Sequence, residues 1–248
     1  MNLLTSINSA YLPFGKIFFN SLLKLDDYKK INKIYVIDGG MTDSDKTTIE
    51  TLSNKIIFIE SETKNIKNAK IHSDEWVALV SNKTKTFLEL IKKNITPLIF
   101  VDVDCYFKEN FLHLIDMNSD IFLCERSKPE FNRYDYKLTH IGSFFGVSKY
   151  NNETKKFMES WINEMLHIKG KPIETPALCE ILRKYDFDLK ISNIQEDLVS
   201  CHSKKQNLEK FNDCKIFHLK STGPSKYLSI VDSRISRLSK YIDVNGLL

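Results

Sequence analysis

The sequence predicts a single α/β domain in which a mostly parallel sheet is flanked by helices. Short apolar segments alternate with longer segments whose apolar residues recur at helical spacing, and this alternation is typical of a parallel sheet. One apolar run, 98–101, ends in Asp102-Val103-Asp104, and open α/β sheets bind ligands beyond the carboxyl ends of their strands. The sequence shows no internal repeat and no flexible linker, so we expect one domain over 1–248.

The N-terminal part contains three expected strands separated by helical patterns. The segments 3–7, 33–37 and 56–59 are short and rich in Leu, Ile and Val, as buried strands are. Residues 14–25 carry apolar side chains three and four positions apart, which predicts a helix. The sequence Thr-Asp-Ser-Asp at 42–45 is typical of a helix N-cap region, and it leads into a helix expected at 46–52.

The central part continues the same alternation. Residues 74–92 form an expected long helix with one apolar side, and 98–103 form the strand that leads to the two aspartates. Further strands are expected at 120–124 and at the glycine-containing segment 141–147. An amphipathic helix is expected at 151–167.

The C-terminal part predicts two helices and two late strands. A helix is expected at 174–183, where Pro176 is tolerated because it lies in the first turn. Short strands are expected at 189–191 and 215–219. Apolar residues at helical spacing with basic residues nearby predict an amphipathic helix at about 227–242.

Composition excludes several classes of protein. The chain is 42% hydrophobic and 27% charged, as globular proteins are, and its formal charge of +4 gives no reason to expect a nucleic-acid partner. The 5 cysteines form no CxxC pair and the N-terminus has no secretory signal, which favours the cytoplasm. No stretch approaches the roughly 20 apolar residues that a membrane-spanning helix needs.

Asp102 and Asp104 are the leading candidates for a metal site. Side chains at i and i+2 on one strand point the same way, and two close carboxylates repel unless a cation lies beside them. Oxygen ligands of this kind suit Mg²⁺ or Mn²⁺, which in turn bind diphosphates. In the alternative interpretation, the two aspartates only end the strand and cap the next turn.

Four segments together resemble the GT-A glycosyltransferases. Residues 34–43 (IYVIDGGMTD) resemble the second strand and turn of that family, and 98–106 resemble its DxD metal motif. Residues 142–147 (GSFFGV) resemble its acceptor-side strand, and 216–226 (IFHLKSTGPSK) resemble the late metal-and-phosphate segment of glycogenin-like members. The resemblance spans roughly 3–227 and implies a GT-A, Rossmann-like fold.

The resemblance implies transfer of a sugar from a nucleoside-diphosphate donor, which we expect to be UDP-linked, to a glycan, a lipid-linked acceptor or another hydroxyl. It also implies Mn²⁺ or Mg²⁺ as a Lewis acid that offsets charge on the departing diphosphate. Asp102, Asp104 and His218 are the implied metal ligands, with Asp102 also near the ribose. Asp38 is expected to face the nucleotide base.

The late segment is implied to bind the donor phosphates. Lys220 and Lys226 would hold them as point charges, and Gly223 would let backbone amides approach them. The segment departs from the glycogenin-like pattern in two places: more residues separate His218 from Gly223, and no Trp follows Lys226.

Other candidates come from the helices and from the acceptor side. Lys83 or Lys85 precedes the DxD strand, where relatives often place a basic residue against the diphosphate. Glu174 begins a helix where inverting relatives place a general base and retaining relatives a group that binds sugar hydroxyls, although helix N-termini also favour glutamate for dipole reasons alone. His140 is a further candidate for contact with the sugar.

Three alternatives to this function remain open. A haloacid-dehalogenase-like phosphatase would use Asp102 and Asp104 as nucleophile and acid, although Tyr106 stands where that family carries Thr or Val. A nucleotidyltransferase would need a glycine-rich basic loop after 3–7, and a non-catalytic sugar-nucleotide-binding module would not require a metal. Separately, the helix at 227–242 could make peripheral contact with the inner face of a membrane or pack on its own domain.

Overall fold

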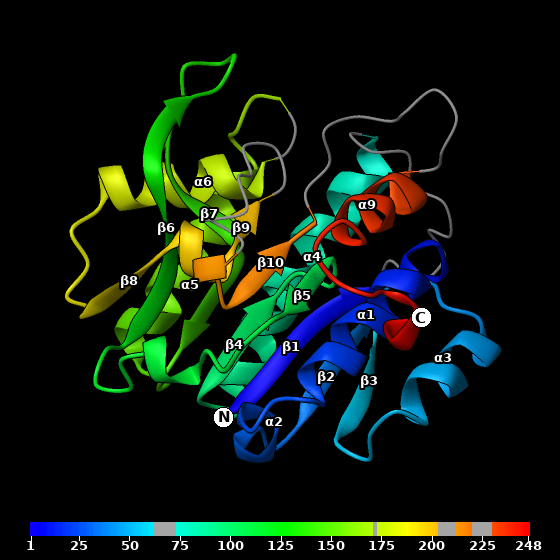
Figure 1. Ribbon diagram of the computed structural model, residues 1–248. Helices are drawn as coiled ribbons and strands as arrows, with labels where there is room; N and C mark the ends of the chain where they lie inside the picture. Colours follow the sequence, from blue (N-terminus) through cyan, green and yellow to red (C-terminus); the bar gives the residue numbers. More distant parts are fainter. Residues whose placement is uncertain (62–72, 171–172, 203–211, 220–229) are drawn as a thin grey trace.

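The computed structural model describes residues 1–61, 73–170, 173–202, 212–219 and 230–248. A seven-stranded mixed sheet forms the centre of the domain (Figure 1). Its strands lie in the order β3 (Ile56–Glu60), β2 (Ile34–Asp38), β1 (Asn2–Ile7), β4 (Leu98–Val101), β7 (Lys137–Val147), β6 (Ile121–Phe131) and β8 (Ile191–Gln195). Neighbouring strands are parallel except that β7 runs antiparallel to both β4 and β6. The predicted α/β fold with a mostly parallel sheet is therefore confirmed.

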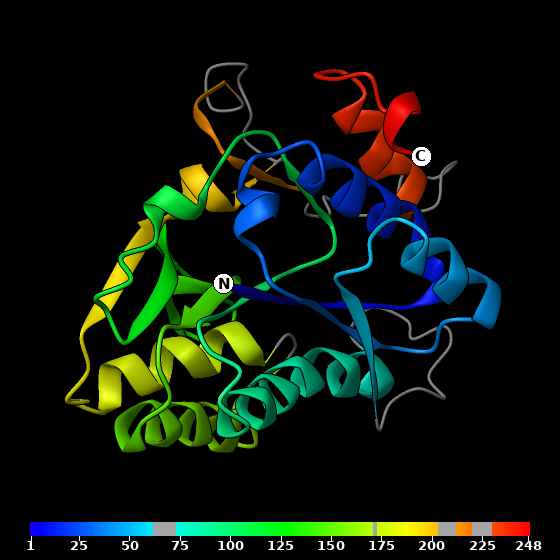
Figure 2. The same ribbon diagram turned by 90° about the horizontal axis from the view of Figure 1, so that it is seen from below.

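Helices cover both faces of this sheet, as Figure 2 shows in a view along its edge. The helices on one face are α4 (Asp74–Lys92), α5 (Asn152–Met165) and α6 (Glu174–Lys184). The helices on the other face are α1 (Leu12–Leu22), the short α2 (Asp27–Lys30) and α3 (Asp43–Glu50). The adjacent residues Leu3 and Leu4 of β1 belong to the two separate cores because successive side chains of a strand point to opposite faces.

A small second sheet lies beside the carboxyl end of β4. Its strands are β5 (Cys105–Phe107), β10 (Ile216–His218) and β9 (Cys201–His202), with β10 in the middle. The helix α7 (Glu196–Val199) leads into β9. The sequence predicted β10 nearly to its bounds but did not predict β5 or β9, which are too short to show a period.

Several predicted boundaries are wrong by a few residues. The strand expected at 98–103 ends at Val101, so Asp102 and Asp104 lie in a bend rather than on one strand. The strand expected at 120–124 extends to Phe131 and forms a long hairpin with β7. This extension escaped prediction because its residues are exposed and polar. The N-cap of α3 is Thr42, so this helix begins earlier than expected.

The expected C-terminal helix is α9 (Ile230–Leu238), which ends four residues earlier than expected; residues 227–229 lie outside the described residues. Leu238 is completely buried in a cluster with Phe14 and Ile17 of α1. The helix therefore packs on its own domain through this residue. Among the described residues, no helix combines the length and the apolar content needed to cross a bilayer.

Candidate functional site

The pairing of β5 with β10 brings together residues that are distant in the sequence. In the antiparallel register His218 lies opposite Cys105, and the Leu219 backbone N–H donates to the Asp104 carbonyl over 2.8 Å. His218 is thereby held beside Asp104, as the metal interpretation requires.

His218 faces both aspartates. Its Nε2 atom lies 3.1 Å from Asp104 Oδ1 and 3.8 Å from Asp102 Oδ2. Its Nδ1 atom lies 3.0 Å from Ser200 Oγ, and the imidazole is almost fully buried. When Nδ1–H donates to the serine hydroxyl, Nε2 presents its lone pair toward the carboxylates, which is the tautomer that a metal ligand requires.

Each aspartate is also paired with a cationic side chain. Arg234 Nη1 of α9 lies 2.6 Å from Asp104 Oδ2, and Lys83 Nζ of α4 lies 3.1 Å from Asp102 Oδ1. These cations offset the charge of two carboxylates that would otherwise repel each other. Sequence reasoning assigned Arg234 only to the basic side of an amphipathic helix and did not predict this contact.

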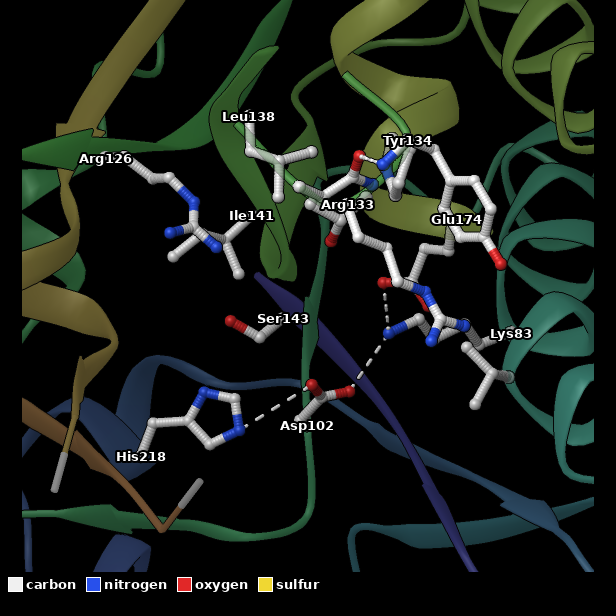
Figure 3. Close-up of a pocket in the computed structure, with 14 residues that line it drawn as sticks. Lys83, Asp102, Arg126, Arg133, Tyr134, Leu138, Ile141, Ser143, Glu174 and His218 are labelled. Atoms are coloured by element: carbon white, nitrogen blue, oxygen red, sulfur yellow. Dashed lines mark hydrogen bonds and ion pairs between the residues drawn. The ribbon is translucent and has the colours of Figure 1, made fainter. Parts of the chain in front are cut away.

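Lys83 connects Asp102 with Glu174, the candidate catalytic residue (Figure 3). Its ammonium lies 2.8 Å from Glu174 Oε1 and donates to the Gly142 carbonyl over 3.1 Å. Burial lowers the pKa of Lys83, but Asp102 and Glu174 outweigh burial and hold that pKa above its usual value. Lys83 therefore remains a buried cation that fixes two acidic side chains.

Two neighbours hold Glu174 in position at the start of α6. The Trp161 indole N–H donates to the Glu174 backbone carbonyl over 2.9 Å. A Cβ atom on Gly142 would overlap the Glu174 carboxylate, so a larger residue at this point of β7 would displace the carboxylate from this position.

Asp38 lies at the carboxyl end of β2, and its carboxylate is bound by the turn that follows this strand. Its carboxylate accepts hydrogen bonds from the backbone N–H groups of Gly40 and Met41 and lies 2.6 Å from Lys46 Nζ. Burial raises the pKa of Asp38, but these partners outweigh burial and hold it below its usual value. In the described structure, Asp38 therefore stabilises this turn.

A cavity of about 620 Å³ unites most of the site (Figure 3). Asp102 and His218 lie at one end of it, and Lys83 and Glu174 at one side. The β6–β7 hairpin supplies much of the remaining wall. The hairpin residues that line the cavity are Arg126, Asn132, Arg133, Tyr134, Leu138, Ile141 and Ser143.

The other candidates have different surroundings. His140 is buried, with Nε2 3.2 Å from Asn193 Oδ1, and does not line this cavity. Lys85 is exposed on α4. The predicted phosphate ligands Lys220, Gly223 and Lys226 lie outside the described residues.

The donor set fits a divalent cation. Ligand atoms of Asp104, Cys105 and His218 lie within 4.8 Å of one another, and Asp102 faces the same imidazole nitrogen. The carboxylate oxygens and the imidazole nitrogen are ligands that Mn²⁺ accepts, whereas the Cys105 thiol is a ligand that softer metals prefer. The serine behind His218 supplies the second hydrogen bond that orients metal-binding imidazoles.

Comparisons with known proteins identify the family of the chain and its fold. A family model described as nucleotide-diphospho-sugar transferase matches residues 44–226. The galactosyltransferase LgtC, solved in complex with donor and acceptor sugar analogues, has a TM-score of 0.60 at 10% identity, covering 100% of both chains.

Two further solved structures share the fold. The bifunctional glycosyltransferase WbbM has a TM-score of 0.60 at 11% identity, covering 96% of this chain and 49% of that one. The glycosyltransferase GlyE of Streptococcus pneumoniae TIGR4 has a TM-score of 0.56 at 11% identity, covering 99% of this chain and 61% of that one. No curated protein sequence matches the chain.

Proposed function

The chain belongs to the family of nucleotide-diphospho-sugar transferases, and we propose that it uses Mn²⁺ or Mg²⁺ to move a sugar from a UDP-linked donor to a glycan or lipid-linked acceptor. The cluster of Asp102, Asp104 and His218 carries this proposal. Family membership favours a glycosyltransferase over the phosphatase alternative that the aspartate pair alone left open.

The three residues of this cluster would hold the cation, which when bound offsets the charge that develops on the departing diphosphate. Ser200 fixes the ring of His218 from behind. Lys83 holds Asp102 on the side away from His218. Ser200 and Lys83 therefore hold two of the proposed metal ligands in position, and neither needs to touch the substrate to do so.

Glu174 lines the cavity and is the proposed contact with a reacting sugar. Its Oε1 atom is held by the Lys83 ammonium. An adjacent ammonium stabilises the charged carboxylate, which favours a group that accepts hydrogen bonds from substrate hydroxyls over one that takes up a proton. Removal of the acceptor proton by Glu174 is the alternative role, and it would apply in an inverting reaction.

Donor turnover provides the test. The protein is incubated with UDP-sugars and Mn²⁺, and release of UDP is measured with and without excess chelator. We expect turnover that depends on the metal, and we expect Asp104→Asn to abolish it. The exposed Asp116 serves as a matched control, because Asp116→Asn makes the same chemical change away from the cavity. Tight UDP binding without any turnover, on a range of donors and acceptors, would instead support a module that only binds sugar nucleotides.

A further inference from the structure

We propose that the sugar side of this cavity binds an anionic group, a carboxylate or a phosphate carried by a sugar substrate, and that Arg126 and Arg133 recognise it. This inference rests on the proposed glycosyltransferase function and specifies a class of substrate for it.

Arg126 is the first observation. It lies on β6 and points into the cavity, with its guanidinium on the side opposite Lys83 (Figure 3). Its Nη1 atom pairs with Glu130 Oε1 at 2.5 Å, but its Nε–H is buried and has no hydrogen-bond partner in the described structure. The Nε atom itself has almost no accessible surface, whereas the side chain as a whole lines the cavity. Buried donors are nearly always satisfied, so we infer that this guanidinium reorients to meet an acceptor that a ligand brings into the cavity.

Arg133 is the second observation. It lies in the turn between β6 and β7 and lines the same cavity. Its one contact given by the described structure is with the ring of Tyr134, at 4.8 Å from guanidinium carbon to ring centroid. Because this contact is with an aromatic ring rather than a carboxylate, the positive charge of Arg133 is not neutralised by it.

The distribution of charge in the cavity also favours an anion beside the hairpin. The charge of Lys83 is offset by Asp102 and Glu174, which are both bound to it. The partner of Arg126, by contrast, has a side chain that is 55% exposed, and exposed ion pairs are weak because water screens them. The hairpin wall is therefore the electropositive part of the cavity.

The strand order separates this wall from the expected nucleotide side. Asp38 ends β2 and Asp102 follows β4, whereas Arg126 lies on β6, on the far side of β4 from β1 and β2. An anion at Arg126 would thus belong to the sugar or acceptor rather than to the nucleotide. Guanidinium groups bind carboxylates and phosphates through paired N–H donors, so either a carboxylate or a phosphate on the sugar could bind to these arginines.

Neutral sugars and their anionic counterparts, which carry a carboxylate or a phosphate at the same carbon, test the proposal. For the donor, binding of UDP-glucose and UDP-glucuronic acid is compared by calorimetry in the presence of Mn²⁺. For the acceptor side, binding of glucose, glucuronic acid and glucose 6-phosphate is compared on protein saturated with UDP and Mn²⁺. We expect one anionic ligand to bind about tenfold or more tightly than its neutral counterpart, which is the usual contribution of a charged hydrogen bond.

Variants assign this preference to residues. Arg126→Gln is expected to remove the preference for the anion without changing the affinity for UDP, and Arg133→Gln to reduce it. Arg126→Lys keeps the charge but loses the paired donors, so it should retain part of the preference and provides a second test if Arg126→Gln folds poorly. Lys128→Gln is the matched control, because Lys128 is an exposed cation of the same strand outside the cavity.

Three outcomes would overturn the proposal. Equal affinity of wild type for charged and neutral ligands in both series would exclude an anion site. Weaker binding of UDP itself to Arg126→Gln would show that Arg126 binds the donor diphosphate. A preference that survives both arginine substitutions would place the anion elsewhere. If the wild-type protein does not bind UDP at all, the proposed function fails instead, so the two failures are distinguishable.

Discussion

Replacing Lys83 by methionine should destabilise the protein strongly, because it removes the cation between two acidic side chains. The side chains of Lys83 and Glu174 are only 6% and 7% exposed, so water screens their contact little. Breaking a buried ion pair by removing one partner typically costs about 3–5 kcal/mol. Asp102 is 29% exposed and can regain water, which places the expected loss near the lower end, at about 3 kcal/mol.

The partner substitution should cost less. In Glu174→Gln, Lys83 keeps its contacts with Asp102 and with the Gly142 carbonyl, so we expect a loss of about 1–3 kcal/mol. In the double variant both members of the pair are neutral, and its loss should fall short of the sum of the single losses by about 1–3 kcal/mol.

Urea unfolding followed by circular dichroism measures these free energies, with unchanged slopes confirming that the same transition is compared. Lys85→Met is the control, because Lys85 is exposed on the same helix and should change stability by less than about 0.5 kcal/mol. Losses that add within about 0.5 kcal/mol would refute the reasoning, because they would show that Lys83 and Glu174 are not energetically coupled.

Three further predictions concern ligands and pH. In the presence of Mn²⁺, UDP at 100 times its Kd should stabilise the protein by about 2.7 kcal/mol in a thermal shift assay, and an equal shift with excess chelator would exclude the metal role. His218→Ala and Asp104→Asn should each weaken Mn²⁺ binding, and their effects should not add because the two side chains share one proposed ligand; wild-type Mn²⁺ affinity in His218→Ala would leave the histidine a structural residue. The pKa of Asp38 lies below its usual value of 3.8, so its contribution to stability is present above that pH and is lost as the pH falls through the lower folded pKa. Acid unfolding of Asp38→Asn should therefore depend less on pH below about 3.8 than acid unfolding of wild type, and identical profiles would contradict the assigned contacts.

The sequence predicted the parts of the fold that have a clear period. Alternating apolar segments and helical patterns located six of the seven strands of the main sheet and the longer helices on both faces. The strand expected at 189–191 overlaps β8 only at Ile191, and the short helix α2 was not predicted. The pattern could not show that β7 runs antiparallel, because strand direction depends on the path of the chain between strands. It also missed the outer half of the β6–β7 hairpin, whose exposed residues carry no apolar alternation.

The sequence likewise predicted some residues of the site and missed others. The aspartates were recognisable because they follow a buried strand, and His218 because it lies in a segment that resembles a known family. Ser200 and Arg234 reach this cluster from distant parts of the chain. Helical spacing indicates which side of a helix is polar, but it does not show that one arginine of that side will meet a partly buried aspartate 130 positions earlier.

The ladder between β5 and β10 determines which changes of length the chain can tolerate around its site. Asp104 and His218 are 114 positions apart, yet three backbone pairs set their alignment. Residues inserted into loops between the two strands leave this alignment intact. One residue inserted within 216–218 would turn the imidazole to the opposite face, because side chains alternate along a strand. In related sequences of different length, the corresponding histidine should therefore be sought by its pairing with the strand that follows the aspartates, not by its distance from them.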